Sequence, residues 1–349
     1  TNEKTAMEAA LGMSYAGKRA LVCMKHVGMN VAADAFVNSA ITGVNGGLVV
    51  LAADDPSMHS SQNEQDSRFY GKFAMIPILE PSTQQEAYDM MKYAYALSEE
   101  KKLPVLLRVV TRLAHSRAGV VVNDLMPQNA LNPDKERTWV LLPAIARRQY
   151  ASLVAKQPEL VESSEHSPYN GMNAFEGKAK LGVIACGIGY NYVMENDPQS
   201  LGIPVLKVSQ YPLPEASIKA LAAQCESLLV AEDGQPLVEE QVKAILGADY
   251  ALKGRLTGDL PRMGELTPDC VGAALGVNIE QPYTEAQNVM PRPPALCQGC
   301  GHRDVYDALN KVAAEYEGAR IFGDIGCYTL GALPPFRAID SCVDMGASI

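Results

Sequence analysis

Two stretches of this chain alternate short apolar runs with helical segments, and this alternation constrains the fold more than any other feature. The first stretch ends near residue 125, and the second covers residues 179–251. In both, apolar runs such as 47–53 and 181–185 are followed by segments with helical periodicity. Strands that alternate with helices form parallel sheets covered on both faces. The sequence therefore predicts an α/β fold with parallel sheets flanked by helices.

The individual elements follow from the same patterns. Strands are expected at 19–24, 47–53, 76–79, 104–110, 181–185, 205–208 and 227–231. Helices are expected at 3–15, 28–41, 84–98, 144–156, 215–225, 236–246 and 304–317, with another beginning near the last residues, 346–349. Turn residues and charged stretches predict a linker over 126–178, and Pro and Gly predict a second, irregular linker over 252–295.

Composition narrows the class of protein. The 349 residues suffice for two or three domains, and the net charge of −10 argues against nucleic acid or an anionic membrane as a partner. No apolar run reaches the ~18 residues of a membrane span. Eight cysteines at irregular spacing, without an export signal, favour reduced thiols in a cytoplasm. Since the chain opens at Thr1 without an initiator Met, we expect a fragment that lacks both ends.

Two glycine-rich blocks flank the last expected helix. The first is Cys297-Gln-Gly-Cys-Gly-His-Arg303 and the second is Phe322-Gly-Asp-Ile-Gly-Cys-Tyr-Thr-Leu-Gly331. Glycine-rich turns on either side of a helix allow α/β enzymes to bring backbone N–H groups close to a phosphate or a ring cofactor. The pair Cys297 and Cys300 also suggests a zinc or iron–sulfur site, but such sites usually need four ligands and no second CxxC exists.

Three further segments carry candidate functional side chains. The first helix starts with Glu3, followed by Ala6 and Gly12, although a carboxylate is also favourable at any helix N-terminus. The loops 25–30 and 54–68 follow expected strands, and ligands bind at the carboxyl ends of parallel strands. These loops are either binding loops or solvated turns.

Together, these segments resemble the thiamine-diphosphate-dependent 2-oxoacid:ferredoxin oxidoreductases. The amino-acid sequences of three motifs, 323–331, Leu333-Pro-Pro335 and 345–349, are similar to those in the α subunits of indolepyruvate ferredoxin oxidoreductases. The resemblance implies a pyrimidine-binding domain over 1–125, with its N-terminal part missing. It also implies a transketolase C-terminal-like domain over 179–251 and the start of a diphosphate-binding domain over 296–349.

The resemblance also implies roles for individual residues. Glu3 would be the catalytic carboxylate that contacts N1′ of the cofactor's aminopyrimidine, because a desolvated carboxyl shifts its tautomer. The residues expected to contact the cofactor are Cys297, Gly299, Cys300, His302, Asp324, Gly326 and Cys327, the last beside the thiazolium. Those expected to contact the 2-oxoacid are His26, His59 and Arg68. The ligands of Mg²⁺ and of the [4Fe-4S] clusters are expected outside this chain, so no metal is expected within it.

The implied reaction is the oxidative decarboxylation of arylpyruvates such as indolepyruvate to arylacetyl-CoA. Ferredoxin would accept the electrons, coenzyme A the acyl group, and a β subunit would be the partner chain. A pyruvate- or 2-oxoglutarate-specific relative remains an alternative, as does a non-catalytic structural fragment. The hypothesis of a nicotinamide-dependent dehydrogenase is supported only by the motif Gly187-x-Gly189. Such a motif is more often a tight packing turn. The chain alone is expected to be inactive and to bind thiamine diphosphate poorly.

Overall fold

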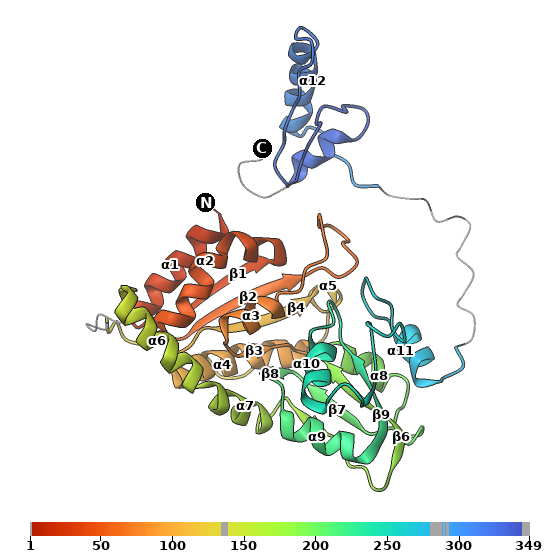
Figure 1. Cartoon of the computed structure of the whole chain (residues 1–349). Coiled ribbons are helices and arrows are strands. Elements are labelled where there is room, and N and C mark those ends of the chain that lie inside the picture. The colour runs from red at the N-terminus through yellow and green to blue at the C-terminus, as the bar shows by residue number, and fades with distance from the viewer. Residues whose placement is uncertain (1, 134–138, 280–287, 289, 291–292, 344–349) are drawn as a thin grey trace. The chain divides into compact units, whose positions relative to one another are not determined.

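The computed structural model describes residues 2–133, 139–279, 288, 290 and 293–343. The chain divides into two compact units, residues 3–280 and 281–349, and each is described by itself (Figure 1). The helix expected at 346–349 and the motif at 345–349 lie outside the described residues.

The first sheet of the larger unit is formed mainly by the N-terminal stretch. Its strand order is β1 (Ala20–Lys25), β2 (Leu48–Asp54), β4 (Val105–Val110), β3 (Ile78–Leu79) and β8 (Gln210–Tyr211). The first four strands are parallel, and only β8 joins in antiparallel orientation. The predicted parallel sheet is confirmed. As the strands are parallel, their carboxyl ends meet at one edge, where the candidate loops begin.

Helices cover both faces of this sheet (Figure 1). They are α1 (Glu3–Tyr15), α2 (His26–Thr42), α3 (Arg68–Ala74), α4 (Gln84–Lys101) and α5 (Thr111–His115). Successive strand residues point to opposite faces. Val50 therefore belongs to the core that includes α2, whereas its neighbour Val49 packs with Met90 of α4. The strands are buried on both sides, which explains their nearly continuous apolar runs.

The second sheet belongs to the same unit. Its order is β10 (Ala251–Lys253), β9 (Cys225–Ala231), β6 (Ala179–Cys186), β7 (Val205–Val208) and β5 (Gly171–Met172). Its helices are α8 (Gly189–Met194), α9 (Glu215–Gln224), α10 (Leu237–Leu246) and α11 (Pro268–Leu275). One apolar core contains Val50 of the first sheet together with Ile184 and Leu206 of the second. This shared core explains why residues 3–280 form one unit.

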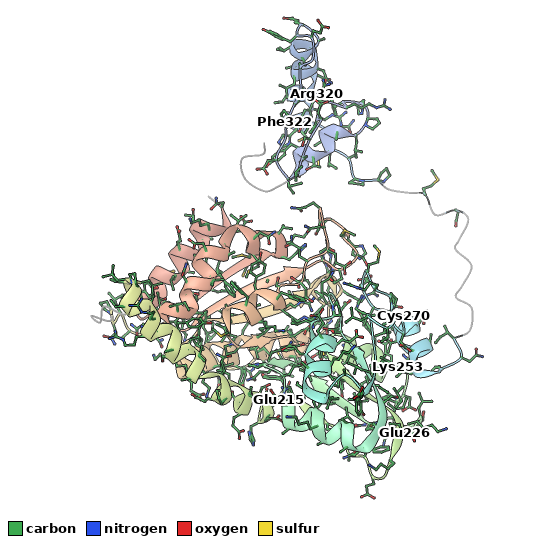
Figure 2. All side chains as sticks on the ribbon, viewed as in Figure 1. Glu215, Glu226, Lys253, Cys270, Arg320 and Phe322 are labelled. Atoms are coloured by element: carbon green, nitrogen blue, oxygen red, sulfur yellow. The ribbon has the colours of Figure 1, made fainter. Side chains whose placement is uncertain are left out.

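Both predicted linkers are more structured than expected. The first contains the predicted helix, α6 (Pro143–Ala155), and also α7 (Gln157–Glu165), which buries Leu160. The second was predicted to be irregular, and this was wrong over α11. Thr267 caps that helix by accepting the N–H of Cys270, which Figure 2 labels, and Gly276 ends it with a φ of 84°. A Thr-Pro start and a Gly stop are ordinary helix signals, here hidden by the surrounding Pro and Gly.

The Gly187-x-Gly189 turn is a packing turn. A Cβ atom at Gly187 would lie 2.5 Å from Cγ of Glu80, and one at Gly189 would lie 2.6 Å from the carbonyl oxygen of Ala231. The glycines therefore admit protein atoms, not a pyrophosphate. This confirms the packing interpretation of the motif.

The smaller unit is built around one helix, α12 (Gly301–Ala313), and a short 3₁₀ helix, η2 (Cys327–Ala332). The predicted helix at 304–317 thus exists but begins and ends earlier. Its core consists of Leu296, Tyr306 and Ala338. Phe322, labelled in Figure 2, pairs with Ser341 through a β-bridge while its side chain stays exposed. Among the described helices of the chain, none has the length and apolar character to cross a membrane.

Candidate active site at the carboxyl edge of the first sheet

A cavity of about 870 Å³ opens where β1, β2 and β4 end. It is lined by Lys25, Ala53, Asp54, Asp55, His59, Ser60, Thr111, Arg112, Ala114, His115, Ser116 and Glu265. The two segments expected as binding loops, 25–30 and 54–68, thus both contribute to one cavity. The first is not a loop, because β1 ends at Lys25 and α2 begins at His26, and only Lys25 of this segment lines the cavity. This is the position at which parallel α/β sheets bind ligands, and the volume is typical of a small-molecule site.

Asp55 organises the loop that forms one wall. Its carboxylate accepts hydrogen bonds from the backbone N–H groups of His59 (3.2 Å) and Ser60 (2.9 Å) and from the Ser61 hydroxyl (2.5 Å). It also accepts one from the hydroxyl of Thr111 at 2.9 Å. Burial alone would raise the pKa of Asp55, but these hydrogen bonds hold it well below its usual range. The loop is therefore fixed by an ionised carboxylate.

The charged groups of the cavity are matched in pairs. The Lys25 ammonium lies 3.4 Å from Asp55. Arg112 donates to Oε1 of Glu265 at 2.5 Å, and Nε2 of His59 lies 3.5 Å from the same oxygen. The Arg112 and His59 side chains are 43% and 52% exposed, so water and ligands can reach both.

Arg112 and Glu265 are site residues that the sequence analysis missed. Arg112 is the second residue of α5, which directly follows β4, so the rule that selected the segments after β1 and β2 would also have selected it. Glu265 comes from the segment predicted as a second linker, and no local pattern marks it. Only the fold brings it to the first sheet.

Of the three residues expected to contact the 2-oxoacid, only His59 lines the cavity. His26 is buried, with its ring nitrogens 3.4 Å and 3.2 Å from the carbonyl oxygens of Ala53 and Asn63. Arg68 is fully buried and donates to Asp66 and to the carbonyl oxygen of Gln235. The described contacts of His26 and Arg68 hold the segment 54–68 in place from inside the protein. Contact of either side chain with the substrate stays a prediction.

Arg68 belongs to a buried charge network between the two sheets. It comprises three guanidinium groups and five carboxylates: Arg68, Arg108, Arg255, Asp54, Asp66, Glu80, Glu232 and Asp233. Arg108 of β4 donates to Asp54 at 2.5 Å, to Glu80, and to the carbonyl oxygen of Asp233 at 2.8 Å. Side chains from both sheets thus share one set of ion pairs, with carboxylates in excess.

Burial, opposed by the neighbouring guanidinium groups, determines how these carboxylates titrate. Burial raises the pKa of Glu232 to about 7 and that of Asp233 to about 6. Burial would also raise the pKa of Asp66, but Arg108 and Arg68 bring it down to about 2. The pKa of Asp54 is raised, chiefly by burial. The network therefore retains protons near neutral pH instead of holding five buried negative charges.

Glu3 lies at the N-terminus of α1 and reaches across to α2. A Cβ atom at Gly28 would lie 2.6 Å from Cγ and 3.1 Å from Oε1 of Glu3, so a larger residue there would displace the Glu3 side chain from this position. The Glu3 side chain is half-buried, and it makes no hydrogen bond or ion pair with the part of the chain that the structure describes. An unpaired, partly desolvated carboxylate is available to a ligand.

In the smaller unit, the two glycine-rich blocks lie side by side. Sγ of Cys300 lies 3.3 Å from Nδ1 of His302, whose ring packs edge-on against Tyr328 at 5.5 Å. Tyr306 donates to the carbonyl oxygen of Tyr328 at 2.6 Å. The structure thus brings Cys300 and His302 close to the 322–331 block, as expected for a shared site.

The remaining predicted cofactor residues occupy turns of this unit. Asp324 accepts the N–H of Ile325 at 2.7 Å, and its carbonyl oxygen accepts from the Cys342 thiol. Gly299 has a φ of 75°, while Cys297, Gly326 and Cys327 are exposed. Within the described ranges, no group of three or more His, Cys, Asp and Glu side chains is arranged to hold a metal ion. Their contacts with a cofactor stay predictions.

Comparison with known sequences finds curated relatives that match the whole length of this chain and carry the same name. The chain is 42% identical to the indolepyruvate oxidoreductase subunit IorA of Methanothermobacter thermautotrophicus, over the whole chain and 59% of that relative. It is 41% identical to the IorA subunits of Archaeoglobus fulgidus and Pyrococcus abyssi, of which it covers 58% and 57%. The chain therefore spans a little under three fifths of the length of these curated relatives. No family model matches it.

Solved structures support the fold. The 2-oxoglutarate:ferredoxin oxidoreductase from Magnetococcus marinus matches 79% of this chain and 56% of its own, with a TM-score of 0.59 and 13% identity. A split-gene transketolase matches 79% of this chain and 81% of its own, with a TM-score of 0.52 and 16% identity. At such identities the likeness shows the arrangement of sheets and helices alone.

Proposed function

Because the chain belongs to the family of the indolepyruvate oxidoreductase subunit IorA, we propose that it carries part of the active site for oxidative decarboxylation of arylpyruvates. The products would be an arylacetyl-CoA and reduced ferredoxin, and indolepyruvate is the expected substrate. A β subunit, ferredoxin and coenzyme A would be the partners. The eight cysteines are all free, which suits a reducing cytoplasm.

The observation that carries this proposal is the Glu3 carboxylate beside Gly28, which has no hydrogen bond or ion pair among the described residues. Its place suits the aminopyrimidine of thiamine diphosphate, whose N1′ needs a carboxyl partner in a partly desolvated site. When bound, thiamine diphosphate would supply the nucleophilic carbon and the electron sink that decarboxylation of a 2-oxoacid requires. Glu3 contributes a proton held at N1′, and the glycine at position 28 keeps that carboxylate in place.

The cavity at the end of β1, β2 and β4 is proposed to hold the 2-oxoacid. Arg112 offers a planar guanidinium that can bind a carboxylate through two N–H groups. His59 lies on the opposite loop and approaches the same Glu265 oxygen as Arg112. Ala53 and Ala114 add apolar surface to the lining. This combination suits one carboxylate joined to an uncharged side chain.

The glycine-rich blocks of the smaller unit are proposed to contact the cofactor through His302, Asp324, Gly326 and Cys327. His302 is held against Tyr328 of the second block, and Gly331 lets that block approach Tyr306, because a Cβ there would lie 2.4 Å from its ring. Cys297, Gly299 and Cys300 would complete this set. The ligands of Mg²⁺ and of the iron–sulfur clusters are assigned to residues outside this chain.

The test is Glu3→Gln in the assembled oxidoreductase. The amide keeps the shape but cannot hold the proton at N1′, and loss of such acid–base help typically lowers a rate by about 10²–10⁴-fold. Deuterium exchange at C2 of the thiazolium should slow by a comparable factor. Glu8→Gln is the matched control, since Glu8 is exposed on the same helix and pairs only with Lys4, at 3.9 Å. An unchanged exchange rate in the Glu3 variant would remove this residue from the mechanism.

A further inference from the structure

We propose that Glu265 is a specificity-determining residue that makes the cavity reject 2-oxoacids with a second carboxylate. This inference rests on the proposed function, since it takes the cavity to be the 2-oxoacid site. It concerns a residue from the segment after β10, which the sequence places far from the first sheet.

The first support is the charge inventory of the cavity. Its two permanent cations already face carboxylates: Lys25 faces Asp55, and Arg112 faces Glu265. Asp54 turns away to Arg108 in the buried network. One substrate carboxylate can share the exposed Arg112 fork, but a second carboxylate would meet no unpaired permanent cation in the lining. It would instead lie in the field of Glu265 and Asp55.

The second support is the way in which Glu265 is held. Its backbone N–H donates to the Ser57 hydroxyl at 2.7 Å. The N–H groups on either side donate to Glu64 (2.8 Å) and to Asp233 (3.0 Å). Arg255, fully buried, donates to the carbonyl oxygen of Gly264 at 3.0 Å. The backbone is thus pinned from several segments, so the Glu265 charge belongs permanently to the cavity wall.

The third support is the depth of the Glu265 side chain. It is 16% exposed, against 43% for its partner Arg112. Water therefore screens the Glu265 charge less than it screens a surface carboxylate. Repulsion between like charges at contact distance is stronger where the effective dielectric constant is lower. The charge acts on whatever group extends past Arg112, which in a 2-oxoacid is the side chain.

The experiment compares 2-oxoglutarate with its γ-amide, 2-oxoglutaramate, and with phenylpyruvate. The amide has nearly the same shape as 2-oxoglutarate but lacks the second charge. In the assembled wild-type oxidoreductase, kcat/KM for the amide should exceed that for 2-oxoglutarate by about 10- to 100-fold, through KM. Glu265→Gln should shrink this ratio toward one. Glu265→Asp, which keeps the charge, should leave it within about threefold of wild type.

Two controls separate the possible failures. Glu159→Gln removes an exposed glutamate that pairs with Lys101 on the surface, and it should leave the ratio unchanged. Arg112→Met should raise KM for all three 2-oxoacids. A wild-type ratio near one, or a ratio that Glu265→Gln does not move while Arg112→Met still raises KM, overturns the role of Glu265 and leaves the proposed function standing. If Arg112→Met changes no KM, the cavity is not the 2-oxoacid site, and the roles proposed for the cavity and for Glu265 both fail, whereas the Glu3→Gln test of the proposed function is unaffected.

Discussion

The buried charge network and the cavity are built from the same kinds of residue but differ in their access to water. In both, a guanidinium group from a helix beside the first sheet pairs with a carboxylate from a segment that follows a strand of the second sheet, Arg68 with Glu232 in the network and Arg112 with Glu265 in the cavity. Arg68 and Arg108 are fully buried, whereas Arg112, four residues after Arg108, is 43% exposed. The difference teaches that burial, not pairing as such, separates a structural ion pair from one that a ligand can exchange.

The two environments differ in what the loss of one partner costs. Removing one partner of a buried pair leaves an uncompensated charge, which costs about 3–5 kcal/mol. An exposed pair contributes about 0–1 kcal/mol, because water screens it. The network should therefore hold the two sheets together, while the cavity pair should be nearly neutral for stability and matter for binding.

The largest effect is expected for Arg108→Met. The change leaves Asp54 and Glu80 without their shared cation inside the protein, so the free energy of unfolding should fall by about 3–5 kcal/mol. Denaturant unfolding measures it. Lys219→Met is the control, as its pair with Glu215 is exposed and one helical turn apart, and it should cost no more than about 0.5 kcal/mol. Equal small losses in both variants would contradict a structural role for the network.

An intermediate effect is expected from pH. Burial raises the pKa of Glu232 to about 7 and that of Asp233 to about 6, above the ~4 of carboxyls in an unfolded chain. The folded state thus keeps protons that the unfolded state has released. Their contribution is complete below about pH 4 and is lost as the pH rises through about 7.

Glu232→Gln tests this pH dependence. Between pH 5 and pH 8 the variant should lose about 2–3 kcal/mol less stability than the wild type, because the amide carries no charge to bury. Urea unfolding at several pH values measures the difference. Glu226→Gln, on β9, the strand that ends one residue before Glu232, should follow the wild type because Glu226 is exposed (Figure 2). A variant that loses stability as steeply as the wild type would show that Glu232 does not hold the proton.

The smallest effect on stability is expected for Arg112→Met. Its pair with Glu265 joins the two sheets across the cavity, but water reaches the guanidinium, so the free energy of unfolding should change by less than about 1 kcal/mol. Thermal unfolding beside Arg108→Met makes the comparison direct. If the free energy of unfolding fell as far as in the Arg108 variant, the pair of Arg112 and Glu265 would also be a structural ion pair that stabilises the fold.

The sequence predicted the sheets better than the segments between them. Continuous apolar runs such as 47–53 can hardly be anything but buried strands, and β2 covers 48–54. The helix at 268–275 was missed because its signals, Thr267 and Gly276, stand among other turn-forming residues. Formation of this helix depends on tertiary packing, since Val271 and Leu275 are buried in the core of the second sheet.

For the candidate site, the sequence pointed to the right edge of the sheet but not to all of its residues. The end of β1 and the loop after β2 meet there because parallel strands end together. Which side chains face the cavity could not be read from those segments. His59 turns toward it, whereas His26 and Arg68 turn inward to partners that lie far away in the chain, such as Gln235.

The amino-acid sequence by itself determined the α/β class and the positions along the chain of the longer strands and helices, such as β2, β4, α2 and α4. These features follow from local periodicity and backbone sterics, which act over a few residues. Only the tertiary structure decided that Arg108 is buried among carboxylates while Arg112 stands in water beside Glu265. Solvent access and charge pairing depend on segments that lie far apart in the chain, 153 residues for Arg112 and Glu265, and no local pattern encodes which of them will meet.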